Sequence, residues 1–361
     1  MDFDYSEEQR HLRDEARRFL TAHCPSSIVR TAYHNGFDRG LWEQIAAQGW
    51  LSVAMPEAHG GMGLGRVELA AIAEEIGAAL APLPFGSTLY LFAEAVMMAG
   101  SETQRAAILP QVAQGRLIGC GAIFEGAGDF DVARIEAAVT DGRLTGQKSP
   151  VVDGGIADVA VVAARDEAGP GLFLVHLDPT VEREMLEAID GSANVAALVF
   201  HDTPAQRLGT SDARAIERLL EHAAALYAFE QVGGADRCLK MAIVYVKERQ
   251  AFGGPVGRFQ GVKHKLANLY VDNELARSHA FHGIWAVETG DPVLPRAAAA
   301  ARVAASDAFW GASRETIHLH GAMGFTWDHD AHLHYRRAHH LSLALGSPQW
   351  WKDRLFAALA G

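Results

Sequence analysis

Residues 248–260 of the chain read ERQAFGGPVGRFQ, and this short stretch joins two long segments of helical character. Its first arginine, Arg249, carries a planar fork of donors suited to phosphate oxygens. Phe252 offers a face to an aromatic ring, and the glycines let the backbone approach a ligand closely. The combination is typical of a dinucleotide site such as one for FAD, although no Rossmann-type element lies nearby. A helix–helix corner with fortuitous charges remains the alternative from these residues alone.

The composition describes a globular protein that could hold one large domain or two to three modest ones. Hydrophobic residues make up 49% of its 361 residues, and no run of about 18 apolar residues could span a bilayer. The acidic, polar N-terminus is unlike a signal peptide. Three isolated cysteines, Cys24, Cys120 and Cys238, fit a reducing compartment without a disulfide or zinc framework. The net charge of −12 argues against a nucleic-acid partner. We therefore expect a cytoplasmic protein without a membrane span.

The sequence pattern changes near residue 117, where helical periodicity gives way to short β-type runs. Before this point, Ser6 to Gln9 has the pattern of a capping box, and further helices are expected near residues 41–48, 67–76 and 101–114. After it, the expected strands are 117–124, 158–164, 172–177 and 197–201. Asp-Gly and Gly-Pro pairs separate these runs, as expected for a compact antiparallel β-domain.

Helical periodicity returns at Asp212. Long helices are expected near residues 212–246, 262–287 and 296–318, with a final helix ending near Leu359. We therefore predict an α+β fold with an N-terminal helical domain (1–115), a middle antiparallel β-domain (116–210) and a C-terminal four-helix bundle (211–361).

Three other motifs are candidates for a site. The glycine-rich loop 60–65 fails the GxGxxG register, because counting from Gly61 puts Arg66 at the last position, so a structural turn is predicted. The C-terminal histidines have no recognisable metal-ligand spacing, which favours surface or interface histidines and predicts no metal site. The turn 321–325 reads as a helix C-cap by itself, but beside residues 248–260 it becomes a second candidate for backbone contact with a ligand.

Over essentially its whole length, the chain resembles the acyl-CoA dehydrogenase family. The most specific match is RQAFG at 249–253 with Phe259-Gln260. Further similar stretches are 49–51, 56–57, 60–63, 74–77, 141–148, 155–158, 321–325 and 335–338. This resemblance implies FAD and an acyl-CoA substrate that is oxidised at its α and β carbons. A glutamate would remove the α proton, the β hydride would pass to the flavin, and an electron-transfer flavoprotein would be the electron acceptor.

The resemblance also implies that each FAD is shared between two subunits of a dimer within a tetramer. The neighbour's arginine-phenylalanine-glutamine motif and glycine turn would hold the pyrophosphate and adenosine half. In this chain the implied cofactor-binding residues are Arg249, Phe252, Gln260, His318, Gly321 and Ala322.

The chain departs from the family at both positions where a catalytic base is usually found. The usual glutamate position holds Leu345, and the alternative position, 26 residues before Arg249, holds Ala223. Neither side chain can accept a proton, so no catalytic residue is predicted. Glu221 is two residues from the alternative position, about 200° round a helix, and is a poor replacement.

The flavin-ring side departs as well. A family Thr-Glu-Pro is replaced by Phe124-Glu125-Gly126, and a family Lys-x-Trp-Ile-Thr by residues 148–152, which read KSPVV. Pro150 and Val152 thus stand where tryptophan and threonine would contact the flavin. The losses fall on one half of the FAD site, while the half around Arg249 is largely kept.

These departures lead to the hypothesis of a non-catalytic subunit in a heteromeric acyl-CoA dehydrogenase. A paralogous catalytic subunit would complete an α2β2 assembly, and the family's members of this type suggest a steroid side-chain acyl-CoA as substrate. Three alternatives stay open: a self-sufficient homotetramer with an unrecognised base, a different flavin-dependent oxidation, and a flavin-free scaffold subunit.

Overall fold

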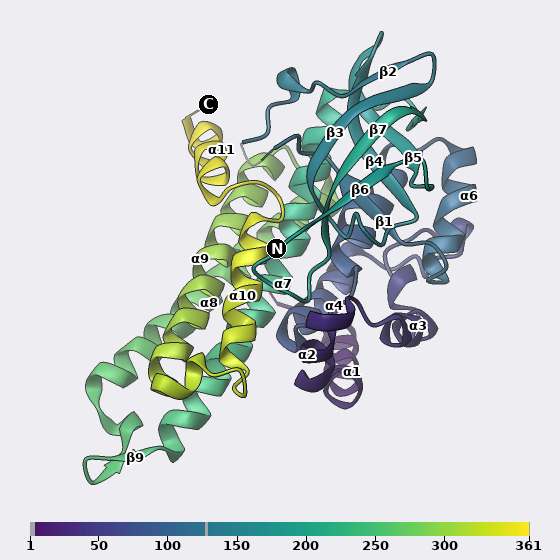
Figure 1. The fold of residues 1–361 in the computed structure, drawn as a ribbon. Helices are drawn as coiled ribbons and strands as arrows, with labels where there is room; N and C mark the ends of the chain where they lie inside the picture. The colour runs from purple at the N-terminus through teal and green to yellow at the C-terminus, as the bar shows by residue number, and fades with distance from the viewer. Residues whose placement is uncertain (1–3, 127–128, 361) are drawn as a thin grey trace.

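The N-terminal part of the protein is a cluster of helices, coloured purple to blue in Figure 1. The computed structural model describes residues 4–126 and 129–360. The helices of this part are α1 (Glu7–His23), α2 (Ser26–Asn35), α3 (Arg39–Ala47), α4 (Arg66–Ala79), the π-helix η3 (Gly86–Ala93), α5 (Glu94–Ala99) and α6 (Glu102–Ala113). The predicted capping box precedes α1: the Ser6 hydroxyl accepts the N–H of Gln9 at 3.2 Å, and the Gln9 side chain accepts the N–H of Ser6 at 2.9 Å.

The middle part is an eight-stranded sheet in the order β6-β7-β3-β2-β4-β5-β8, with β1 paired to β4. Its strands are β1 (Gly119–Ala122), β2 (Ala138–Thr140), β3 (Arg143–Val152), β4 (Val159–Asp166), β5 (Gly169–His176), β6 (Glu182–Leu186), β7 (Val195–Pro204) and β8 (Gln206–Arg207). The sheet is mixed rather than wholly antiparallel, because β1 runs parallel to β4 and β2 meets β4 in parallel at Ala138 and Arg165. Strand β1 enters the sheet from α6 instead of through a hairpin, which permits this direction.

The C-terminal part is a bundle of long helices, coloured green to yellow in Figure 1. Its helices are α7 (Ala213–Glu248), α8 (Gln260–Thr289), α9 (Leu294–His320), α10 (Ala331–Leu343) and α11 (Pro348–Ala360). The predicted final helix is two helices, since the chain turns at Gly346 with φ +85°. Helix α7 also contacts α4 and β5, so it connects the bundle to both other parts.

The crossing of α4 and α7 is a direct contact between two helix backbones. A Cβ atom added to Gly77 would lie 1.8 Å from the carbonyl oxygen of Glu230, and one added to Gly233 would lie 1.8 Å from that of Glu74. Only glycine fits at both positions, because any side chain would overlap the opposite backbone. The N-terminal helices are therefore held against the bundle by two reciprocal glycines.

No helix within residues 4–126 and 129–360 combines the length and the apolar character needed to cross a membrane. The α+β architecture of three parts is confirmed, whereas the exact domain boundaries at 115/116 and 210/211 stay a prediction.

Candidate functional site

The stretch around Arg249 forms the tip of the bundle, at the end far from the sheet (Figure 1). Helix α7 ends where the N–H of Arg249 donates to the carbonyl of Tyr245 at 2.8 Å. Strands β9 (Gln250–Ala251) and β10 (Gly254–Pro255) then form a small hairpin. Phe252 occupies its turn with φ +54° and is 88% exposed. A bulky residue in this left-handed region of φ is uncommon, and such strain is often found at functional positions.

The side chain of Arg258 stabilises the hairpin at the tip. Its guanidinium donates to the carbonyls of Phe252 and Gly253, the latter at 3.1 Å, and lies 5.0 Å from the centre of the Phe259 ring. The side chain of Arg249 is exposed and takes part in no ion pair or side-chain hydrogen bond with the described residues. Arg258 therefore serves the fold of the hairpin, while Arg249 leaves its donors available.

The second predicted segment lies close to this tip. Helix α9 ends at His320, and Gly321 follows with φ +63° at the start of the short helix η6 (Gly321–Phe325). The ring of His320 stacks on that of Tyr245 with centroids 4.1 Å apart, which joins the end of α9 to the last turns of α7. Around this junction, His318, Gly321, Ala322, Met323, Phe325 and Trp327 are exposed.

Both positions of the usual catalytic base are buried and apolar. Leu345 and Ala223 have no measurable exposure, and the carbonyl of Leu345 accepts the indole N–H of Trp351 at 2.7 Å. Glu221, two residues from Ala223, is buried and accepts a hydrogen bond from Arg354 on α11 at 3.0 Å. Burial raises the pKa of Glu221, and Arg354 opposes that shift.

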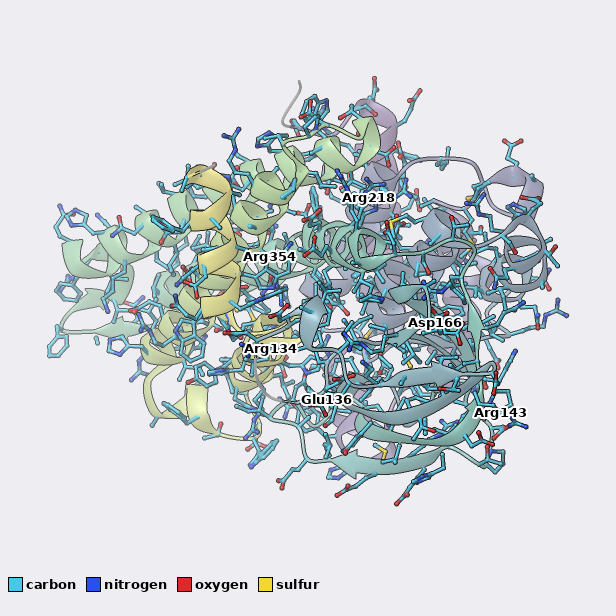
Figure 2. All side chains as sticks on the ribbon, turned by 90° about the horizontal axis from the view of Figure 1, so that it is seen from above. Arg134, Glu136, Arg143, Asp166, Arg218 and Arg354 are labelled. Carbon is cyan, nitrogen blue, oxygen red and sulfur yellow. The ribbon has the colours of Figure 1, made fainter. Side chains whose placement is uncertain are left out.

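Aromatic side chains pack together around Phe124, one of the residues that depart from the family pattern, and a cavity of about 240 Å³ lies beside Phe124 and Phe130. Phe124 contacts Phe130 at a centroid distance of 5.8 Å, Phe130 contacts Trp350 at 6.4 Å, and Trp350 contacts Trp351 at 4.9 Å. We call these four residues the aromatic cluster. Arg354 covers both tryptophan rings, 4.9 Å and 5.5 Å from their centres, where the bundle and the sheet meet (Figure 2).

Glu125, which follows Phe124 of the aromatic cluster, forms an ion pair with Lys148 of β3. The Lys148 ammonium is fully buried, lies 2.7 Å from the Glu125 carboxylate and donates to the Ile123 carbonyl at 3.2 Å. The same carboxylate accepts the N–H groups of Glu136 and Ala137. Although burial acts in the opposite direction, these donors lower the pKa of Glu125. The pair thus holds the end of β1 and strand β3 together, and the Glu125 carboxylate is fully engaged by these donors.

A network of charged side chains joins the three parts of the molecule. Arg337 of α10 donates to Asp190, in the connection between β6 and β7, and to Ser192. It also lies 3.8 Å from Glu230 of α7. The hydroxyl of Ser87 in η3 donates to Asp153 at the end of β3, at 2.5 Å. Asp153 and Asp190 are not identifiable as network members from the sequence, and Glu230, which is out of register for the alternative base position, gives no sequence signal for its contact with Arg337.

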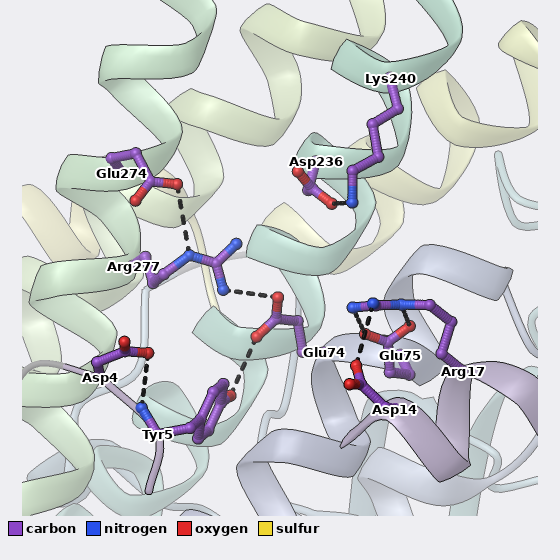
Figure 3. A network of polar contacts seen from close by, with 10 residues as sticks. All are labelled: Asp4, Tyr5, Asp14, Arg17, Glu74, Glu75, Asp236, Lys240, Glu274 and Arg277. Atoms are coloured by element: carbon purple, nitrogen blue, oxygen red, sulfur yellow. Dashed lines mark hydrogen bonds and ion pairs between the residues drawn. The ribbon is translucent and has the colours of Figure 1, made fainter. Parts of the chain in front are cut away.

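A second network fixes the N-terminal helices on the bundle (Figure 3). Glu74 of α4 accepts the hydroxyl of Tyr5 at 3.0 Å and pairs with Arg277 of α8 at 2.6 Å. The next residue, Glu75, pairs with Arg17 of α1 at 2.7 Å. These contacts are structural, since each carboxylate is already satisfied by partners from another helix.

Two family models match the chain. The model of the acyl-CoA dehydrogenase N-terminal domain covers residues 6–116, and that of the C-terminal domain covers residues 213–359. The acyl-CoA dehydrogenase IpdE2 of Mycobacterium tuberculosis is 32% identical over 348 residues, which span 95% of this chain and 94% of IpdE2. The chain belongs to the acyl-CoA dehydrogenase family. Members of this family are FAD-binding oxidoreductases.

Solved structures agree with this assignment. A variant of the Tcur3481-Tcur3483 steroid ACAD has a TM-score of 0.89 and 32% identity, with 98% of both chains covered. The ChsE4-ChsE5 complex from Mycobacterium tuberculosis has a TM-score of 0.91 and 28% identity, covering 100% of this chain and 99% of the other. The predicted family and fold class are confirmed.

For an acyl-CoA dehydrogenase, the positions predicted from the sequence separate into two places. The implied cofactor-binding residues gather at the exposed end of the bundle: Arg249, Phe252, Gln260, His318, Gly321 and Ala322. The residues that replace the ring contacts and the base lie near the sheet. Among the described residues, no group of three or more His, Cys, Asp or Glu side chains could hold a metal ion. The roles of the tip residues stay a prediction.

Proposed function

We propose that this chain is the non-catalytic subunit of a heteromeric, FAD-dependent acyl-CoA dehydrogenase. A paralogous subunit would supply the catalytic base and the contacts to the flavin ring, in an α2β2 assembly. The tip of this chain, with Arg249, Phe252 and Gln260, would reach the pyrophosphate and adenosine half of the partner's FAD. His318, Gly321 and Ala322 would line the same place.

The observation that carries this proposal is the contrast between the two half-sites. A Cβ atom added to Gly346 would already lie 3.4 Å from Phe124 and 3.0 Å from Trp350, so the chain around the former base position is tightly packed. The tip, by contrast, presents an arginine that has no side-chain partner among the described residues and an aromatic side chain that is 88% exposed. Guanidinium groups bind phosphate oxygens well in such positions. The residues present therefore fit the phosphate half of FAD, whereas Phe124, Pro150 and Val152 cannot make the polar and aromatic contacts that the family makes to its ring.

The descriptions of two similar structures suggest a substrate for the proposed enzyme. One similar structure is described as a steroid ACAD, and another as a complex of two different chains, ChsE4 and ChsE5. By analogy, we propose a steroid side-chain CoA thioester as the substrate of the assembled enzyme. An electron-transfer flavoprotein as acceptor and a cytoplasmic location belong to the same proposal.

A count of FAD per chain tests the proposal. The chain is purified alone and together with its co-expressed paralogue, and flavin is measured by absorbance after denaturation. One FAD per two chains in the complex, with none in the chain alone, is the expected result. Stoichiometric FAD together with dehydrogenation by this chain alone would refute it.

Substitution of Arg249 separates the proposal from a flavin-free scaffold role. Removing one charge-assisted contact costs about 1.5–3 kcal/mol, so R249Q should weaken FAD binding by the complex roughly 10- to 100-fold. The matched control is R116Q, which changes an exposed arginine in the loop before β1. Unchanged flavin content in the R249Q complex would favour the scaffold.

The alternative of a self-sufficient enzyme has Glu221 as its candidate base, a buried carboxylate whose pKa is raised by burial. Its ion pair with Arg354 opposes this role. An E221Q complex that keeps full turnover would remove that candidate.

A further inference from the structure

A pocket of about 570 Å³ lies where the start of α7 meets the turn between α5 and α6. We call it the arginine pocket, because Arg105, Arg214 and Arg218 line it. Arg105 comes from the first turns of α6, and the other two from the first turns of α7, where Figure 2 shows Arg218. At a rise of about 1.5 Å per residue, Arg214 and Arg249 stand roughly 50 Å apart along α7. The pocket is therefore separate from the tip of the same chain.

The charges of the arginine pocket are unbalanced. None of its three arginines forms an ion pair or a side-chain hydrogen bond with any residue that the structure describes, and the Nε of Arg105 is buried without a partner. The one acidic residue in the lining, Asp212, already caps α7 by accepting the N–H of Ala215 at 2.9 Å. The lining thus carries three cations and one anion in a chain with a net charge of −12.

The positions of these arginines are unfavourable without an anion. Arg214 and Arg218 stand four residues apart on one helix face, where like charges repel. Helices α6 and α7 both begin at the pocket, with N-caps at Ser101 and Asp212, so the positive ends of two helix dipoles add to the field. A bound anion would relieve both effects.

The walls of the arginine pocket are held rigidly. The Gln104 side chain donates to the carbonyl of Arg207 at 2.9 Å and accepts the N–H of Gly209 at 3.1 Å. A Cβ atom on Gly209 would lie 2.4 Å from the carbonyl oxygen of Ala99, so the two wall segments touch. Ser211 is hydrogen-bonded to Leu172 of β5. A rigid backbone frame needs no rearrangement when a ligand binds, so the ordering cost falls on the exposed side chains of Arg214 and Arg218.

We propose that the arginine pocket binds a phosphate-bearing ligand, either a phosphate monoester or a pyrophosphate. Arginine forks and helix N-termini are the groups that proteins use for such oxygens. Met98 and Ala99 form a half-buried apolar wall suited to the organic part of an ester. Coenzyme A and free pyrophosphate share this chemistry. The proposal concerns this chain alone and does not rest on its role in FAD binding.

Calorimetry on the purified complex tests the proposal with three probes: pyrophosphate, coenzyme A and dephospho-coenzyme A. The double variant R214Q/R218Q should weaken binding of at least one probe by about tenfold or more, since two charge-assisted contacts are lost. Equal loss for all three probes would identify the pyrophosphate as the ligand group, and loss for coenzyme A alone would identify its 3′-phosphate.

The control R237Q removes an exposed arginine on the same helix, outside the pocket, and should leave the affinities unchanged. The melting temperature of each variant shows whether it is folded, and R105Q provides an independent single change if the double variant is not. Absence of binding by any probe, or affinities that neither R214Q/R218Q nor R105Q alters, would overturn the proposal.

Discussion

Asp153 should make the stability of the protein depend on pH between about 4 and 7. Its carboxyl is buried among Ser87, Glu230 and Arg337, in a hollow of about 40 Å³. Burial raises the pKa of Asp153 from 3.8 to about 7, although the Ser87 hydrogen bond and the charge of Arg337 act against this shift. In the unfolded chain the carboxyl ionises near pH 4. The wild-type protein therefore loses stability as the pH rises through this window.

The substitution D153N removes this dependence. Asparagine does not titrate, and its amide oxygen can still accept the Ser87 hydroxyl. Well below pH 4, the Asp153 carboxyl is protonated in both the folded and the unfolded protein. The stability of the variant should then match that of the wild type. Each pKa unit corresponds to 1.36 kcal/mol, so the advantage of the variant should grow to about 2 kcal/mol at pH 5 and to about 4 kcal/mol above pH 7.

Melting temperatures of wild type and D153N at pH 5 and pH 8 measure the effect. A shift of several degrees in favour of the variant is expected at pH 8, with a clearly smaller shift at pH 5. The control is D141N, at the exposed turn between β2 and β3, which should show the same small difference at both pH values. Equal shifts for D153N at both pH values, or a variant less stable at pH 8, would refute the reasoning.

Three further substitutions test the packing and the base position. G233A should cost about 3 kcal/mol or more in urea unfolding, because its methyl would overlap the Glu74 carbonyl, whereas G261A, whose methyl meets no atom within 4 Å, should be neutral or stabilising. E94Q should cost about 3–5 kcal/mol, since this fully buried carboxylate pairs with Arg66 at 2.8 Å and accepts from His222. E102Q on the exposed first turn of α6 is its control and should change stability by less than about 0.5 kcal/mol. L345E should give no dehydrogenase activity to the isolated chain, and flavin reduction by an acyl-CoA would contradict the proposed non-catalytic role.

Local features of the fold could be predicted from the sequence, and features that join distant segments could not. The capping box at Ser6 depends on residues three apart, so it was visible in the chain. Strand β3 was missed because its turn residues and Pro150 interrupt the β pattern. The aromatic cluster brings Phe124 next to Trp350, over 200 residues away, and no periodicity encodes such a contact. The unpaired state of Arg249 likewise depends on what the fold leaves beside it.

Single mutations could place a glutamate at position 345 or 223, where the catalytic base is usually found. They would leave the aromatic cluster in place. A glutamate at position 345 would enter a fully buried apolar site next to Trp351, with Phe124 and Trp350 still packed around Gly346. Several changes would have to occur together before any one of them brought a benefit. Under the proposed non-catalytic role, a single substitution at position 345 would not turn this chain into an independent enzyme, and its gene is expected to occur together with that of a partner.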